Sequence, residues 1–81
     1  MFEFNSGLIT RARTKLGLRY IDLSNLTKTI DPEGAGVSEM TCRRIEEFAG
    51  YSPNVRSIIL ISEALQISPR SLLVKKNSEK E

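Results

Sequence analysis

Side chains able to bind an anion or a base gather in one short segment of the chain, between Val37 and Glu47. Arginine binds phosphate, or the O6/N7 edge of guanine, through two parallel N–H groups. At ~100° per residue, a helix here places one set of residues on a continuous arc: Glu39, Met40, Arg43, Arg44 and Glu47. The opposite arc carries Thr41, Cys42, Ile45, Phe48 and Ala49. The segment therefore predicts a helix with one core-facing side and one side that offers two guanidinium groups.

The remaining sequence contains little that could support catalysis. The 81 residues include no histidine and a single cysteine, Cys42, so the commonest general base, an internal disulfide and a structural zinc site are all missing. The Gly34-Ala-Gly36 stretch lacks the Gly-Lys-Ser/Thr ending of a phosphate-binding loop and follows no predicted strand. We therefore expect a protein that is not an enzyme and that uses no cofactor and no metal ion.

Length and composition are those of one small globular domain. Apolar residues make up 40% of the chain and the net charge is +2, a mild excess that is compatible with nucleic-acid binding. The longest apolar run, from Ile58 to Ile61, is far shorter than the ~20 residues that span a bilayer. No secretory signal is recognisable at the N-terminus, and a lone cysteine suits a reducing compartment, so we expect a cytoplasmic location.

Helix caps and turn residues divide the chain into five predicted short helices and no strand. Ser6 is expected to cap the first helix and Gly17 to end it. The second runs from Arg19 or Tyr20 to about Thr27, and a polar loop follows over residues 28–36. Ser38 caps the third helix, which covers residues 38–48. The fold class is therefore all-α, a compact bundle of five short helices.

Two proline dipeptides mark the last two helix starts, because each puts a cap residue before a proline at the first helical position. These are Ser52-Pro53 and Ser68-Pro69. The fifth helix is expected to include Leu72, Leu73 and Val74. Residues 1–74 then form the domain, and residues 75–81 a charged, frayed tail.

Apolar spacing predicts which residues fill the core of this bundle. The expected set is Ile9, Ala12 and Leu16 in the first helix, Ile21 or Leu23 with Leu26 in the second, the inner arc of the third, and Val55, Ile58, Ile59, Ser62 and Leu65 in the fourth, widened by Leu60 and Ile61.

The order and spacing of these features resemble the Cro/lambda-repressor (Xre-type) family of helix-turn-helix DNA-binding domains over roughly residues 7 to 74. The matching pieces are Ile9-x-x-Ala-Arg13, Leu16-Gly-Leu18, Leu23-Ser24, Val37-Ser38, Thr41, Ile45-Glu46, Pro53-x-Val55, Ile58-Ile59, Ala64-Leu65-x-Ile67-Ser68 and Leu72-Leu73.

The resemblance implies that the chain binds double-stranded DNA as a transcriptional regulator. The third helix would contact base edges in the major groove through Glu39, Met40, Arg43 and Arg44. We expect phosphate contacts at or near the helix starts, from Arg19, Tyr20, Ser38, Tyr51 and Asn54. The resemblance also matches Arg13 and Glu46 to a buried ion pair between the first and third helices. A homodimer is expected, with Leu72, Leu73 and Val74 as its apolar surface.

Two positions depart from the family pattern. The family joins its second and third helices by a tight turn of about four residues, whereas residues 28–36 form a longer connection here. Either the extra residues loop out, with Asp31-Pro-Glu33 able to start a helical turn, or the third helix is re-aimed. Ser24 replaces the usual alanine, and its hydroxyl can bond to a carbonyl.

The same residues also suit a second function. The modest net charge, the acidic Glu39 and Glu47 on the outer arc, and the long connection favour a module that keeps the fold but binds another protein. Such a module would use the third helix or the 28–36 loop.

Overall fold

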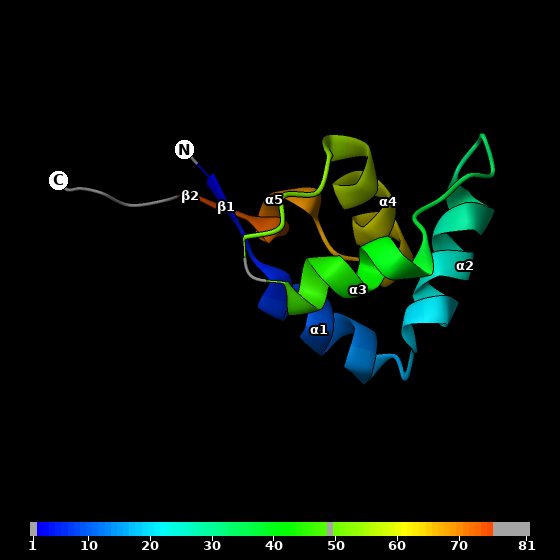
Figure 1. Cartoon of the computed structure of the whole chain (residues 1–81), viewed down its shortest axis with the longest axis horizontal. Helices are drawn as coiled ribbons and strands as arrows, with labels where there is room; N and C mark the ends of the chain where they lie inside the picture. Colours follow the sequence, from blue (N-terminus) through cyan, green and yellow to red (C-terminus); the bar gives the residue numbers. More distant parts are fainter. Residues whose placement is uncertain (1, 49, 76–81) are drawn as a thin grey trace, which may run out of the picture.

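The structure is a computed structural model and describes residues 2–48 and 50–75. Five helices arranged around one core make up most of this part of the chain (Figure 1). The helices are α1 (Ser6–Lys15), α2 (Tyr20–Ile30), α3 (Glu39–Glu47), α4 (Val55–Leu65) and α5 (Pro69–Leu72). Two short strands, β1 (Phe2–Phe4) and β2 (Leu73–Lys75), complete the described elements. The predicted all-α bundle of five short helices is confirmed, with a small strand pair added to it.

The strand pair joins the two ends of the described chain. β1 and β2 are antiparallel, with Phe2 opposite Lys75 and Phe4 opposite Leu73. Next to them, the Asn5 backbone N–H donates to the Leu72 carbonyl oxygen at 2.7 Å. The expectation of no strand was therefore wrong, since a three-residue strand is too short to show a period-2 pattern in the sequence.

The same pairing corrects the predicted C-terminal boundary. Leu73 and Val74 belong to β2 and not to the last helix, and Lys75 lies in this strand and not in the tail. The remaining tail residues, 76–81, lie outside the described residues, as does Ala49.

Helix starts depend on capping side chains, and two of the four predicted caps were misplaced. α1 is capped by Asn5 and not by Ser6, because the Asn5 Oδ1 accepts the Leu8 N–H at 3.2 Å. α4 is capped by Asn54 and not by Ser52, through the Ser57 N–H at 2.8 Å. In both places an asparagine, as strong a cap as serine, stands within two residues of the expected cap.

The caps of α3 and α5 were predicted correctly. The Ser38 Oγ accepts the Thr41 N–H at 3.1 Å, and the Ser68 Oγ accepts the Arg70 N–H at 3.3 Å. Gly17 also ends α1 as expected. It has a positive φ of 69°, and the N–H groups of Gly17 and Leu18 donate back to the carbonyls of Thr14 and Arg13.

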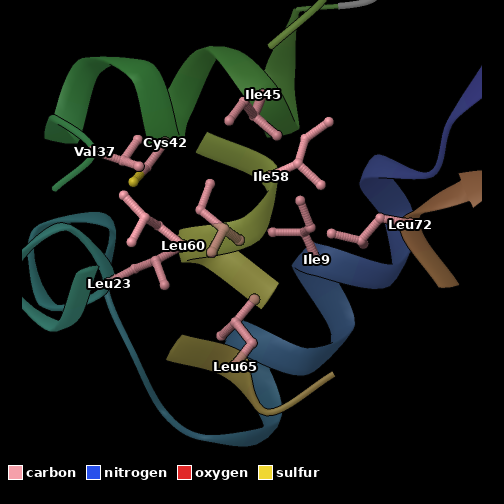
Figure 2. Close-up of a cluster of buried hydrophobic side chains, with 10 residues drawn as sticks. Ile9, Leu23, Val37, Cys42, Ile45, Ile58, Leu60, Leu65 and Leu72 are labelled. Carbon is pink, nitrogen blue, oxygen red and sulfur yellow. The ribbon is translucent and has the colours of Figure 1, made fainter. Parts of the chain in front are cut away.

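The core gathers around α4, with contributions from all five helices (Figure 2). Its buried apolar residues are Ile9, Leu23, Val37, Cys42, Ile45, Ile58, Leu60, Ile61, Leu65 and Leu72. All of them except Val37 and Leu72 were expected in the core. Burial of so many side chains against one helix fixes how α1, α2 and α3 pack around it.

Five residues expected in the core are exposed instead: Leu16, Leu26, Phe48, Val55 and Ile59. Leu16 and Phe48 are the residues at which α1 and α3 end, where the helix no longer aims the side chain inward. Val55 opens α4 and is 70% exposed, and Ile59 follows it one turn later on the same side. The buried arc of α4 is therefore rotated toward Leu60 and Ile61, the residues expected only to widen it.

Candidate nucleic-acid interface

Helix α3 lies across the front of the molecule in the view of Figure 1, between the start of α2 and the start of α4. Its inner side is anchored by Cys42 and Ile45, both buried in the core as expected. Burial raises the pKa of the Cys42 thiol to about 11, so this group stays neutral and unreactive near pH 7. The helix is held by one side only, and the other side faces outward.

The outer side of α3 carries the five residues that the helical arc predicted. Glu39, Met40, Arg43, Arg44 and Glu47 are all exposed. Among the residues that the structure describes, no ion pair involves Arg43 or Arg44. The local pairs with Glu39 and Glu47 that would have neutralised these arginines are not formed, which leaves both guanidinium groups available to a ligand.

Tyr20, the first residue of α2, touches this outer side. Its hydroxyl donates to Glu47 Oε2 at 2.7 Å. The guanidinium carbons of Arg13 and Arg43 lie 4.5 and 5.5 Å from the centre of its ring. Burial and the hydrogen bond to Glu47 raise the pKa of Tyr20 to about 12. Tyr20, which was expected to bind phosphate, is half-buried, and its hydroxyl is already bonded to α3.

The ion pair between Arg13 and Glu46 is present where the resemblance placed it. Arg13 donates from Nε to Glu46 Oε2 at 2.6 Å and from Nη2 to Oε1 at 2.9 Å. The two side chains are only 16% and 3% exposed. Thr10 adds a hydroxyl bond to Oε1 at 2.8 Å, and Arg13 Nη1 donates to the Leu18 carbonyl at 2.7 Å. These bonds tie α3 to α1 and to the turn before α2.

The connection between α2 and α3 differs from its prediction in both position and structure. α2 continues to Ile30, so the connection covers residues 31–38 and not 28–36. The Asp31 carboxylate accepts the Glu33 N–H at 3.0 Å and the Gly36 N–H at 2.8 Å, and it pairs with Arg56 of α4. The Gly34 N–H donates to the Asp31 carbonyl at 2.8 Å, which closes a β-turn in place of the helical turn considered for Asp31-Pro-Glu33.

The end of this connection is held by two buried hydroxyl groups of α2. The Val37 N–H donates to Thr27 Oγ1 at 2.8 Å, and Ser24 Oγ donates to the Val37 carbonyl at 2.6 Å. Thr27 Oγ1 in turn donates to the Ser24 carbonyl at 2.6 Å. Ser24 does bond to a carbonyl, as expected, but across to the connection. Both polar backbone groups of Val37 are fixed one residue before the cap of α3.

The other expected phosphate contacts lie at or near helix starts. Arg19 is exposed and pairs with Asp22, with Nε 3.0 Å from Oδ2. Ser38 and Asn54 cap α3 and α4 and are exposed, whereas Tyr51 is half-buried against the core. The starts of α2 and α4 flank α3 in Figure 1. Free N–H groups and the helix dipole at such starts favour anions.

Comparisons with protein-family models, with curated proteins and with solved structures find no match for this chain. Within the described ranges, no helix is long and apolar enough to cross a membrane. The same residues contain no group of three or more side chains of the metal-ligating types His, Cys, Asp and Glu that could hold a metal ion. The outer side of α3 and the elements that flank it form the candidate interface.

Proposed function

We propose that this chain is a repressor-like transcriptional regulator that binds double-stranded DNA and places α3 in the major groove. One observation carries the proposal: Arg43 and Arg44 are exposed side by side, without an acidic partner among the described residues, on a helix whose opposite side is buried. A helix held in this way presents a rigid set of donors, and arginine is the side chain most often used to recognise guanine.

Each residue of the outer side has a distinct chemical role in this proposal. Arg43 and Arg44 donate to guanine O6 and N7 or to the adjacent phosphates. Met40 suits the methyl group of thymine, and Glu39 accepts from the N4 amino group of cytosine. Glu39 is repelled by phosphate in every sequence, so a site without a cytosine amino group to pair with its carboxylate is disfavoured. The starts of α2 and α4 supply phosphate contacts on either side of α3.

The proposal includes membership of the Xre-type helix-turn-helix family and a cytoplasmic location. It also includes a homodimer, because one five-helix unit buries less DNA surface than specific binding requires. Two copies would contact half-sites about one helical turn apart.

A second candidate function is binding to another protein through α3. The observation in its favour is that Met40 and Phe48, near the two ends of α3, are 56% and 57% exposed. Methionine and phenylalanine are enriched in the centres of protein interfaces. The connection over residues 31–38 is the alternative contact surface for such a partner.

The decisive experiment measures the binding of labelled duplex of random sequence at low and at high salt. We expect the wild-type affinity to fall steeply as salt rises, because bound phosphates release counterions. The Arg43→Ala/Arg44→Ala variant should bind at least about tenfold more weakly and show a salt slope smaller by about one to two.

A matched control tests whether the position of the two arginines matters or only their charge. Arg11→Ala/Arg70→Ala removes the same two charges from exposed sites on α1 and α5. It should lose much less affinity, and circular dichroism should show that both variants remain folded. Absence of low-salt binding by the wild type, or equal losses in the two double variants, would contradict the proposal and favour a protein partner.

A further inference from the structure

Tyr20 is the residue through which α2 contacts the outer side of α3. Its hydroxyl is bonded to the Glu47 carboxylate at 2.7 Å, and its ring lies 5.5 Å from the guanidinium carbon of Arg43. The ring also lies 4.5 Å from the guanidinium carbon of Arg13, whose guanidinium is held by Glu46. Tyr20 is thereby fixed from within the protein while it contacts two residues of the proposed DNA-binding side.

Glu47 has another pairing available to it. It follows Arg43 by four residues and Arg44 by three, the two spacings at which oppositely charged side chains on a helix meet. Neither pair is among the ion pairs of the described residues, and the Glu47 carboxylate bonds to Tyr20 instead. The hydroxyl of Tyr20 therefore competes with the arginines for this carboxylate.

The ring of Tyr20 acts on Arg43 as well. A guanidinium group within about 6 Å of an aromatic ring centre is attracted to the ring face. This contact restricts the rotamers of Arg43, which lowers the entropy lost when the side chain binds a ligand. The ring and the hydroxyl thus have separate effects, one on Arg43 and one on Glu47.

We infer that Tyr20 is a positioning residue for DNA recognition: its hydroxyl keeps the Glu47 carboxylate away from Arg43 and Arg44, and its ring orients Arg43. This inference rests on the proposed function. It replaces the expectation that the Tyr20 hydroxyl binds phosphate directly, because that group is already bonded to Glu47.

A double-mutant cycle on DNA binding tests the inference with Tyr20→Phe, Glu47→Gln and the two combined. Tyr20→Phe keeps the ring, so the stacking on Arg13 and Arg43 and the fold are preserved. We expect this variant to bind duplex about two- to threefold more weakly, since the freed Glu47 pairs with an arginine at helical spacing. In the Glu47→Gln background the same substitution should have no effect, because no carboxylate remains to be released.

The two possible roles of the Tyr20 hydroxyl, holding Glu47 or binding phosphate, predict different results in the double-mutant cycle. If its hydroxyl bound phosphate, Tyr20→Phe would weaken binding equally in the wild-type and in the Glu47→Gln background, and the inference would be overturned. It would also be overturned if Tyr20→Phe bound DNA as the wild type does. Failure of the wild type to bind any duplex is a separate result, which removes the proposed function and this inference together.

A measurement without DNA tests the contact itself. Glu47→Gln should lower the pKa of the Tyr20 hydroxyl from about 12, because the neighbouring negative charge is lost while burial of the ring remains. Titration in the Tyr51→Phe background assigns the signal, since the chain contains only these two tyrosines. An unchanged Tyr20 pKa would show that Glu47 is not held by Tyr20 in solution.

Discussion

Among single residues, Glu46 couples α3 to α1 through a buried ion pair. Its side chain is 3% exposed, and its carboxylate accepts two bonds from Arg13 and one from Thr10. A buried pair with this geometry is costly to break from one side, because the remaining charge stays in a dry environment. The exposed pair of Arg19 and Asp22 has no such effect, because water and salt screen it.

Removal of one partner of the buried pair should destabilise the protein strongly. We expect Glu46→Ala or Arg13→Ala to lower the free energy of unfolding by ~3–5 kcal/mol, measured by urea denaturation followed by circular dichroism. The double variant Arg13→Met/Glu46→Leu removes both charges and keeps the side-chain volume. Its free energy of unfolding should fall far less. Arg11→Ala, at an exposed site on the same helix, should have little effect. A loss of under ~1 kcal/mol for Glu46→Ala would show that the pair is effectively solvated.

The pair of Arg13 and Glu46 could be anticipated only from the family pattern, since their spacing of 33 residues has no local signature. Thr10, the third member of the cluster, was not anticipated. Its hydroxyl reaches Glu46 because α1 and α3 cross at that point, and such a crossing is set by packing. The exposed residues of α3 were predictable, because helical periodicity alone separates them from Cys42 and Ile45.

Among the elements, the connection between α2 and α3 departs furthest from its sequence-based description. Composition predicts only a polar loop, whereas the structure holds the connection at Asp31 and again at Val37. Asp31-Pro-Glu-Gly34 is a recognisable turn sequence, since aspartate side chains bond the backbone two residues on. The bond to Arg56 and the extension of α2 to Ile30 depend on the proximity of α4, which no local pattern reveals.

Gly36 is the residue of this connection that tolerates a side chain least. Its φ is +62°, and a Cβ would lie 2.6 Å from the Lys28 backbone nitrogen and 2.8 Å from the Lys28 Cα. Gly34 also has a positive φ, +76°, but has open space around it. We expect Gly34→Ala to cost about 1 kcal/mol of stability, from backbone strain alone, and Gly36→Ala to cost roughly twice that or more.

Thermal denaturation of the two glycine variants, side by side, provides the measurement. Hydrogen exchange at the Val37 amide should speed up more in Gly36→Ala than in Gly34→Ala, because only the first disturbs the bond to Thr27. Equal losses in the two variants would mean that the close approach to Lys28 does not exist in solution.

The same connection should open in acid. The N–H groups of Gly36 and Glu33, with the Arg56 guanidinium, hold the pKa of the Asp31 carboxyl below its ordinary value of 3.8. Since the folded pKa is depressed, the stabilisation is complete above pH 3.8 and is lost as the pH falls through the folded value. We expect the difference in unfolding free energy between the wild type and Asp31→Asn to be largest near neutral pH and to shrink below pH 3.8.

Urea denaturation of both proteins, from about pH 7 to about pH 2, measures this difference. Glu33→Gln is the control, because its carboxylate is exposed and lies 3.5 Å from Arg56 at the outer end of the same cluster. That variant should differ little from the wild type at any pH. If the difference in unfolding free energy between the wild type and Asp31→Asn did not vary with pH, the ionised Asp31 carboxylate would not be the group that stabilises the connection.

At the scale of the whole molecule, the sequence predicts the number and order of helices well, because four of the five starts carry a cap residue or a proline nearby. The pairing of β1 with β2 has no such signal, since it joins the two opposite ends of the described chain. Directly before β2, Leu72 at the end of α5 points into the core and has no exposed surface. The dimer surface expected from Leu72, Leu73 and Val74 therefore loses its first member to the core.

Leu72→Ala distinguishes a core position of this residue from a position in a dimer surface. Because the Leu72 side chain is fully buried, its truncation should leave a cavity beside Ile9 and α4 (Figure 2). We expect this substitution to lower the free energy of unfolding by ~2–5 kcal/mol at any protein concentration. Leu16→Ala, at an exposed position, should cost little. Sedimentation velocity should give the same oligomeric state for the folded fraction of both variants. If Leu72→Ala instead dissociated an oligomer into folded monomers of unchanged stability, Leu72 would have to lie at a subunit contact and not in the core.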